Sequence, residues 1–232
     1  VLNNVSSSYP QGSKKRKDNY LSKIEGMVFG DSEESGIRRG NEFYHSPLDL
    51  YLSSSNLWEI INTPNTLIFS SPFGEAVLQM TLEDLNFREE PEEYLKRYAQ
   101  NVLEEEDLSI NGFKGYSVKA IQSGKITRMA VIFKQNQVYQ FIGFLKDERS
   151  DFSKFDVEFK EIIKSFRKLN EDEIAYSKPL RISSYEVKQG DTYKSLALKS
   201  SININAEDQL RLINGDYPNK PLTSGRIIKI VK

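Results

Sequence analysis

Residues 115–145, GYSVKAIQSGKITRMAVIFKQNQVYQFIGFL, decide the fold of this chain. The stretch contains three runs rich in β-branched and aromatic residues, GYSVKAIQS, ITRMAVIFK and QVYQFIGFL, joined by the short turns SGK and QNQ. Runs of this composition and length are typical of β-strands, and short turns between consecutive strands produce antiparallel neighbours. The stretch therefore predicts an antiparallel meander of three strands.

Further strands are expected before the meander. Leu48, Leu50 and Leu52 alternate with polar neighbours, as in a half-buried strand. The segments LWEII, TLIFSS and AVLQMTLE have similar composition, and Asn111-Gly112 marks a turn just before the meander. We expect these segments to extend the antiparallel sheet.

Two segments show helical spacing instead. The first begins at Pro91, which suits a first helical turn, and the second begins at Ser153, expected as its N-cap with Asp156 three residues later. Their apolar stripes are Tyr94, Leu95, Tyr98, Val102 and Leu103 in the first, and Phe155, Phe159, Ile162, Ile163 and Phe166 in the second. The fold class predicted is α+β, with helices covering the faces of an antiparallel sheet.

Composition divides the chain into three parts. Residues 1–41 are expected to form an N-terminal arm, in which the basic run Lys14 to Lys17 is interpreted as part of a solvated linker. Residues 42–170 carry the α+β sandwich. After a polar segment with a proline, residues 184–232 show the order strand, helix, helix, strand, with Asp191 expected to cap the first helix.

The overall composition argues against several classes of function. The 32 basic residues nearly cancel the 33 acidic ones, and a net charge of −1 gives no general attraction for nucleic acid or an anionic membrane. No apolar run is long enough for a membrane span. The chain has no cysteine, so disulfides, thiolate metal sites and a cysteine nucleophile are excluded. It begins with Val1 rather than methionine, which suggests a processed or shortened protein.

Catalysis by this chain is not expected. Its single histidine, His45, cannot supply the two imidazoles of a His-Glu-x-x-His zinc site, and no Gly-x-Ser-x-Gly elbow accompanies it. His45 is interpreted as an ordinary surface or strand-entry residue. Acidic residues cluster at residues 89–93 and 104–107, where paired catalytic carboxylates remain an alternative, but solvated helix edges account for them.

The last fifty residues resemble a LysM domain. The matching features are YEVKQGDTYKSLALKS, then LRLINGD, then PLTSGRIIKIVK, in that order.

LysM modules bind N-acetylglucosamine polymers, chiefly peptidoglycan, in a shallow groove between the Gly-Asp-Thr turn and the loop after the second helix. The resemblance implies these glycan-binding residues: Gly190, Asp191, Thr192, Tyr193, Asn214, Gly215 and Asp216. A ring such as that of Tyr193 or Tyr217 is expected to stack on a sugar. Tyr193 replaces the usual leucine, and SSININAED is longer than the standard segment between the helices.

The order of blocks along nearly the whole chain resembles a second family. Residues 20–64 and the segment IIKSFRKLNEDEI are similar to the region that follows the catalytic domain in HtpX-like, CAAX-protease-related bacterial zinc metalloproteases. Residues 42–169 also resemble PsbP-like sandwiches, which are non-enzymatic docking domains. The family's His-Glu-x-x-His helix is absent from this sequence, so the resemblance implies zinc and peptidase activity only for a catalytic domain elsewhere in the parent protein.

These resemblances lead to one main hypothesis and one alternative. The chain is expected to be a non-catalytic accessory region of an envelope metalloprotease, located in the bacterial periplasm or cell envelope. It would hold no cofactor itself, and its partners would be the parent's catalytic domain, substrates, envelope proteins and peptidoglycan. The alternative is a stand-alone structural or protein-interaction domain without sugar binding.

Overall fold

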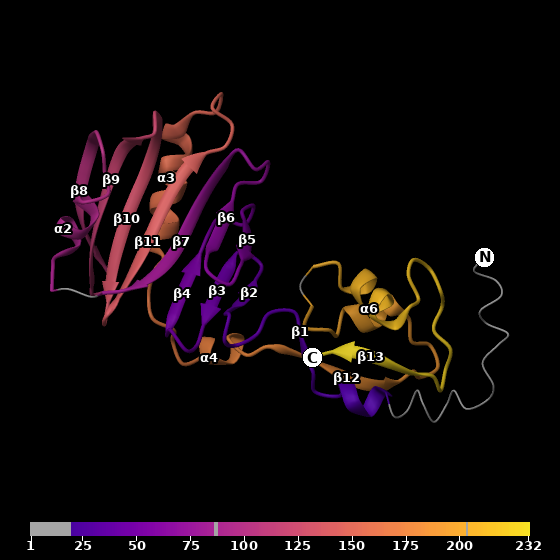
Figure 1. Cartoon of the computed structure of the whole chain (residues 1–232). Helices are drawn as coiled ribbons and strands as arrows, with labels where there is room; N and C mark the ends of the chain where they lie inside the picture. The colour runs from indigo at the N-terminus through magenta and orange to yellow at the C-terminus, as the bar shows by residue number, and fades with distance from the viewer. Residues whose placement is uncertain (1–19, 86–87, 203) are drawn as a thin grey trace. The chain divides into compact units, whose positions relative to one another are not determined.

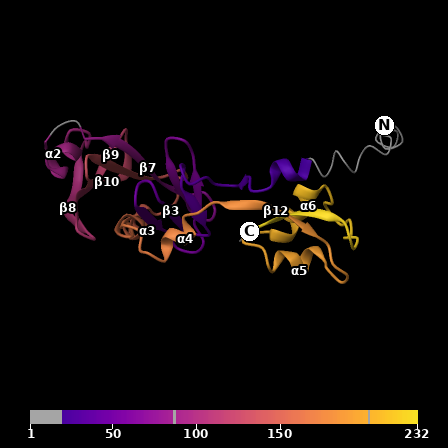
Figure 2. The ribbon, with the colours of Figure 1, turned by 90° about the horizontal axis from the view of Figure 1, so that it is seen from below.

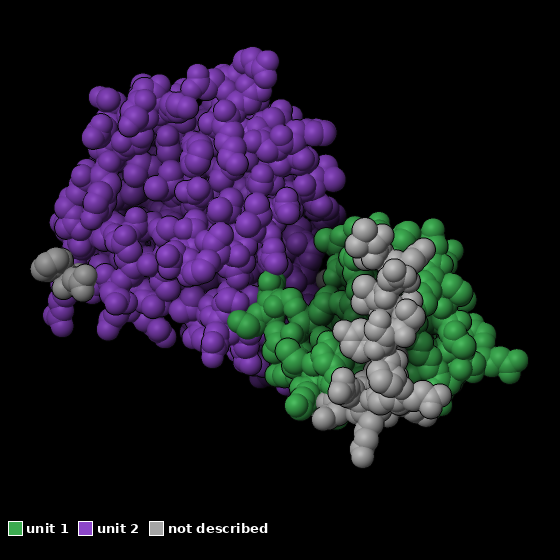
Figure 3. Space-filling view, turned by 45° about the vertical axis from the view of Figure 1, so that its right-hand side comes forward, with its two compact units in different colours: residues 1–32, 179–232 green, residues 33–178 purple. Residues whose placement is uncertain are grey.

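The computed structural model describes residues 20–85, 88–202 and 204–232 and divides the chain into two compact units. Unit 1 contains residues 1–32 and 179–232, and unit 2 contains residues 33–178 (Figure 3). Unit 1 is therefore built from two separate stretches of the chain. The basic run at Lys14 to Lys17 lies outside the described residues.

Unit 2 is organised around a seven-stranded antiparallel sheet (Figure 1). Its strand order is β5-β6-β7-β11-β10-β9-β8. The strands are β5 (Glu59–Asn62), β6 (Leu67–Ser70), β7 (Ala76–Asp84), β8 (Val102–Ile110), β9 (Phe113–Gln122), β10 (Lys125–Lys134) and β11 (Gln137–Leu145). The meander of β9, β10 and β11 is confirmed, and the two turns between its strands carry residues with positive φ, Ser123-Gly124 and Gln135.

A second, three-stranded sheet lies in the same unit. Its strands β2 (Ile37–Arg39), β3 (Glu42–His45) and β4 (Leu50–Ser53) pair antiparallel in sequence order. Phe43, Leu50 and Leu52 from this sheet join the same buried cluster as Phe69 and Phe141 of the large sheet. The small sheet thus shares the main core of unit 2.

Helices cover both faces of the seven-stranded sheet, as Figure 1 and Figure 2 show together. Helix α3 (Phe152–Lys164) buries Phe155, Phe159 and Ile162 in the main core. The closeness of this packing requires Gly143, because a Cβ there would lie 2.6 Å from the Phe159 ring. On the opposite face, α2 (Pro91–Lys96) packs Tyr94 and Leu95 onto β9 and β10. The short helix α4 (Glu173–Tyr176) ends the unit. The structure confirms the α+β class with antiparallel sheets.

Unit 1 combines a three-stranded antiparallel sheet with two helices. The strand order is β1 (Val28–Phe29), β12 (Leu180–Glu186) and β13 (Ile227–Val231), and the helices are α5 (Tyr193–Ala197) and α6 (Ala206–Asn214). Its separate core contains Val187, Leu196, Leu210 and Ile228 among others. The order strand, helix, helix, strand from β12 to β13 agrees with the sequence expectation.

Three local expectations differ from the structure. Residues 20–41 do not form an arm, because residues 20–24 are helical, β1 pairs with β12, and β2 belongs to unit 2. The first predicted helix ends at Lys96, and Val102 and Leu103 lie in strand β8, whose backbone pairs with β9. Helix α3 is capped by Asp151, whose side chain accepts a hydrogen bond from the Ser153 backbone N–H at 2.9 Å.

Among the described residues, no helix is long and apolar enough to cross a membrane.

Candidate functional site

The turn that precedes α5 holds three of the residues expected to bind sugar. Thr192, rather than Asp191, is the N-cap of α5, and it exchanges hydrogen bonds of 3.0 Å with Ser195 in a capping box. Asp191 instead accepts hydrogen bonds from the Lys188 backbone N–H and the Tyr185 hydroxyl, both at 2.8 Å. These two bonds, the backbone one first, lower the pKa of Asp191. Asp191 therefore closes the turn that Gly190 makes with φ near +87°.

A buried hydrogen bond connects this turn to the loop after α6. The Tyr193 hydroxyl donates to Asp216 Oδ2 at 2.6 Å, and Arg226 Nη1 lies 2.6 Å from the same oxygen. Asp216 Oδ1 has no hydrogen bond in the described part of the chain, although Lys220 Nζ lies 3.4 Å away. Burial raises the pKa of Asp216, but the hydrogen bonds from Arg226 and Tyr193 outweigh it, so the net pKa is lowered. Asp216 is an ionised carboxylate at neutral pH.

The burial of Tyr193 corrects one expectation. Its side chain is only 1% exposed, and the Arg211 guanidinium lies 4.7 Å from the centre of its ring. The ring therefore cannot stack on a sugar in this conformation. Burial and the hydrogen bond to Asp216 raise the pKa of Tyr193 well above its ordinary value, so the hydroxyl stays protonated as a donor.

Asn214 and Gly215 shape the end of α6. The Asn214 side chain donates to the Leu210 and Lys229 carbonyls and accepts from the Lys229 N–H, each at 2.8 Å. Gly215 takes a left-handed conformation at the helix C-terminus. The ring that this loop exposes belongs to Tyr217, which is 55% exposed. The seven expected residues thus lie in two segments, the turn and first residue of α5 and the end of α6 with its following loop. The side chains of Asp191, Thr192, Tyr193, Asn214 and Asp216 all have structural partners within the unit.

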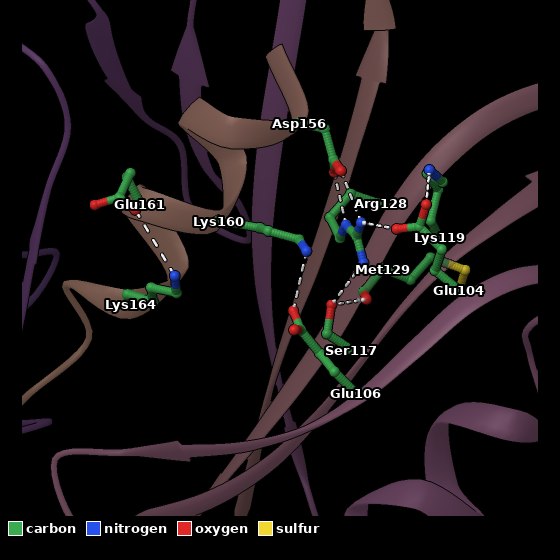
Figure 4. Close-up of polar contacts among 10 residues, drawn as sticks. All are labelled: Glu104, Glu106, Ser117, Lys119, Arg128, Met129, Asp156, Lys160, Glu161 and Lys164. Atoms are coloured by element: carbon green, nitrogen blue, oxygen red, sulfur yellow. Dashed lines mark hydrogen bonds and ion pairs between the residues drawn. The ribbon is translucent and has the colours of Figure 1, made fainter. Parts of the chain in front are cut away.

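Unit 2 contains a charged cluster that sequence analysis did not identify (Figure 4). Arg128 of β10 is 1% exposed and makes a bidentate pair with Asp156 of α3, with both N–O distances 2.7 Å. Arg128 Nη1 also donates to the Ser117 hydroxyl at 3.3 Å, and Nη2 lies 3.6 Å from a Glu104 carboxylate oxygen. At the edge of the cluster, Glu104 pairs with Lys119, and Lys160 lies 3.3 Å from Glu106. Since the buried charges are mutually satisfied, this cluster fastens α3 to the sheet rather than offering a free charged group.

A second feature of unit 2 is an open groove of about 460 Å³ beside the single histidine, here called the His45 groove. It is lined by Glu34, Ser35, Phe43, His45, Leu48, Asn62, Thr63, Pro64, Asn65, Thr66, Leu67, Met80 and Leu82. Sequence analysis missed it because its residues come from four separate stretches of the chain, within residues 34–35, 43–48, 62–67 and 80–82. The isolated His45 was the one available signal.

His45 lies at the end of β3 and is half-buried. Its Nδ1 accepts a hydrogen bond from the Leu48 backbone N–H at 3.2 Å, which places the ring proton of the neutral form on Nε2. The pKa of His45 is lowered, mainly by burial of the ring. Hydrogen bonds to the backbone of His45 and Glu34 raise this pKa in part, and the positive charge of Lys134 lowers it further. His45 is therefore neutral at neutral pH, consistent with a strand-end residue.

No group of three or more histidine, aspartate or glutamate side chains among the described residues is arranged to hold a metal ion.

Comparisons with known proteins give structural similarity only. No protein-family model matches the chain, and no curated protein matches it in sequence. One similar solved structure is cyanobacterial PsbP from Synechocystis sp. PCC 6803, with a TM-score of 0.41, 8% identity and coverage of 63% of this chain and 94% of that one.

Two further solved structures are similar at 11% and 12% identity. A protein from Bacteroides thetaiotaomicron VPI-5482 has a TM-score of 0.39, 11% identity and coverage of 76% of this chain and 58% of its own. LpqN, which is involved in cell envelope biogenesis of Mycobacterium tuberculosis, has a TM-score of 0.35, 12% identity and coverage of 66% and 96%.

Proposed function

We propose that this chain is a non-catalytic accessory region of a bacterial envelope zinc metalloprotease. In this proposal unit 1 binds N-acetylglucosamine polymers through the loops at residues 190–192 and 214–217. Unit 2 docks the protease domain or its substrates, and the zinc and the peptidase chemistry belong to a catalytic domain of the same parent protein.

The observation that carries the sugar-binding part is the hydrogen bond between Tyr193 and Asp216. The Tyr193 hydroxyl of α5, which directly follows the Gly-Asp-Thr turn, lies 2.6 Å from Asp216 Oδ2 in the loop after α6, and this bond links the two ends of the expected site. Gly190, Thr192 and Gly215 are exposed there. The Thr192 backbone N–H and C=O are occupied in capping α5, so the proposed contacts to acetamido groups of a glycan fall on backbone groups of Gly190 and on the Gly215 carbonyl. Tyr217 adds an exposed aromatic face that can stack on a sugar ring.

A second candidate function is a structural or protein-interaction domain without sugar binding. It is favoured by the burial of Tyr193, since the aromatic ring that directly follows the Gly-Asp-Thr turn in sequence is engaged with Arg211 and Asp216 instead of facing a ligand. The two candidates differ in whether any exposed residue of the two loops contributes to glycan retention.

Sedimentation with insoluble peptidoglycan separates the two candidates. The variant to test is Tyr217→Ala, because this ring is exposed and has no role in the core, whereas changes at Asp191 or Thr192 would disturb the turn itself. We expect Tyr217→Ala to reduce retention about two- to tenfold. The matched control is Tyr20→Ala, which removes an equally exposed tyrosine of unit 1. No retention of the unchanged protein at low salt, or equal loss in both variants, would favour the second candidate.

The assignment to a metalloprotease has its own tests. Peptidase assays of this chain with and without added zinc should give no cleavage, and cleavage by the purified chain would reject the proposal. The coding sequence upstream of Val1 should encode a His-Glu-x-x-His helix. A parent without that helix would remove the protease assignment and leave the binding function of unit 1 to be judged separately.

A further inference from the structure

The lining of the His45 groove combines apolar side chains, here called its floor, with uncharged polar residues and a single carboxylate, Glu34, at its exposed rim. Leu67 and Met80 form part of the floor and are buried members of the main core, while Leu48 and Leu82 are partly buried against that core. A volume of about 460 Å³ falls within the usual range of ligand sites. The floor is therefore suited to one large apolar side chain.

The rim of the groove carries a carboxylate without a counter-charge. Glu34 is exposed, and within the described part of the chain its carboxylate makes no ion pair. No lysine or arginine belongs to the lining residues of this groove. Lys134, whose charge acts on His45, is buried and donates to the Leu48 and Asp49 carbonyls, so it is not available at the rim. The rim thus favours a ligand with a positive charge.

The walls of the groove are fixed by contacts within unit 2. The Asn62 side chain donates to the Ser35 carbonyl at 2.6 Å, which joins the β5–β6 hairpin to the loop before β2. Gly36 packs so closely that a Cβ there would lie 2.3 Å from the Phe43 ring. On the other side, His45 Nδ1 holds the Leu48 backbone. A groove formed in advance lowers the ordering cost of binding.

From these features we propose that the His45 groove binds an extended polypeptide segment in which a large apolar residue is followed by lysine or arginine. The apolar side chain fills the floor, and the basic side chain lies at Glu34. The choice of a polypeptide rests on the proposed function, in which unit 2 docks a protein. The charge preference rests on the lining residues alone.

The test uses a fluorescein-labelled Gly-Gly-Phe-Lys-Gly-Gly amide as probe, with fluorescence anisotropy for affinity and amide chemical shifts of the ¹⁵N-labelled full chain for location. Two matched probes replace Phe by Ala or Lys by Glu. We expect the Phe-to-Ala probe to bind about tenfold more weakly or worse. Shifts should concentrate at Thr66, Leu67 and Met80, which line the groove.

Protein variants test the charge at the rim. Glu34→Gln should weaken binding of the Phe-Lys probe about two- to fivefold, as expected for an exposed ion pair. Glu33→Gln, a neighbouring exposed carboxylate that does not line the groove, should leave binding unchanged. Glu34→Lys should reverse the preference, so that the probe with Glu binds better than the probe with Lys.

Three results would overturn the inference: no probe bound at millimolar concentration, equal binding of the Phe and Ala probes, or shifts located away from the groove. Equal effects of Glu33→Gln and Glu34→Gln would overturn the role of Glu34. Retention on peptidoglycan measures unit 1 and should not change in the Glu34 variants. The proposed glycan binding and the peptide site can therefore fail independently of each other.

Discussion

At the scale of single residues, the buried ion pair between Arg128 and Asp156 is a feature of unit 2 whose formation requires desolvation of two charges. An arginine that is 1% exposed has lost nearly all of its hydration, and two hydrogen bonds of 2.7 Å to Asp156 replace it. A buried pair of this kind is costly to break, although an apolar pair of similar volume can be equally stable. The cost of leaving one charge unpaired can therefore be measured separately from the net contribution of the pair, by comparing a single variant with a double apolar variant.

We expect Asp156→Ala to lower the free energy of unfolding of unit 2 by about 3 kcal/mol, because the buried Arg128 charge then keeps only the Ser117 hydroxyl and the more distant Glu104 carboxylate, 3.6 Å away. The double variant Arg128→Met with Asp156→Leu should recover most of that loss. Urea denaturation followed by fluorescence of Trp58, the chain's one tryptophan, measures both. Asp147→Ala serves as control, because it breaks an exposed pair with Arg149 and should change stability little. A double variant no more stable than Asp156→Ala would contradict this account.

His45 gives unit 2 a defined response to acid. Its pKa in the folded protein is lower than the ordinary value of about 6.5 that applies to the unfolded chain. The unfolded state therefore binds the proton first as the pH falls, and the free energy of unfolding decreases between about pH 6.5 and the folded pKa.

The variant His45→Gln removes this proton and should flatten the pH dependence of stability in that window. The measurement is urea denaturation at several pH values between about 5 and 7.5, with NMR titration of the single imidazole giving the folded pKa directly. A folded pKa at or above 6.5, or an unchanged slope in the variant, would show that His45 does not control this response.

The candidate site could be predicted only in part. The Gly-Asp-Thr turn and the Asn-Gly loop are local patterns, and they mark the two loops that the structure brings together. The burial of Tyr193 depends on Arg211, Arg226 and Asp216, which are distant from it in sequence, so no local pattern indicates it. The His45 groove was missed for the same reason, since its lining comes from several strands and loops.

At the scale of elements, strand β8 shows where local sequence and tertiary pairing disagree. Four consecutive acidic residues, Glu104 to Asp107, have low strand propensity and suit a solvated helix. Pairing with β9 along residues 102–110 overrides this preference, and Glu104, Glu105 and Glu106 pair with Lys119, Lys96 and Lys160. By contrast, the meander was predictable because its alternating runs and turns are local.

The same acidic run protects a free edge, since β8 is the last strand of the seven-stranded sheet. We expect the double variant Glu105→Thr with Asp107→Val to associate at concentrations where the unchanged protein is monodisperse, because two such edges can then pair without charge repulsion. Light scattering after size-exclusion chromatography measures it. The control places Glu171→Thr with Asp172→Val outside any strand, with the same loss of charge. Equal association of both variants would assign the effect to net charge alone.

At the scale of the whole molecule, the chain completes unit 1 only after it has passed through unit 2. Residues 26–29 and 180–182 are joined by β1–β12 pairing and by the hydrogen bond from the Gly26 N–H to the Ile182 carbonyl at 2.8 Å. Sequence analysis found the strand-helix-helix-strand order at residues 184–232 but missed this addition, because a two-residue strand has no periodicity to detect.

Gly26→Pro tests the contribution of the N-terminal stretch. Gly26 has φ near +78°, which proline cannot adopt, and proline would also remove the N–H that bonds to Ile182. We expect a loss of about 3 kcal/mol or more in the stability of unit 1, seen as loss of protection from hydrogen exchange at residues 180–186. Trp58 fluorescence reports unit 2 separately. Full protection of β12 in the variant would show that β1 contributes nothing.

The split construction of unit 1 has a consequence for how the protein is made. During synthesis on a ribosome the segment before unit 2 emerges first, yet its pairing partner follows more than 150 residues later, as in the contact of Arg181 with Gly26. Closing so long a loop is entropically unfavourable while the intervening chain is unstructured. Folding of the inserted unit shortens the effective distance, so β1 should remain without a partner until translation is nearly complete.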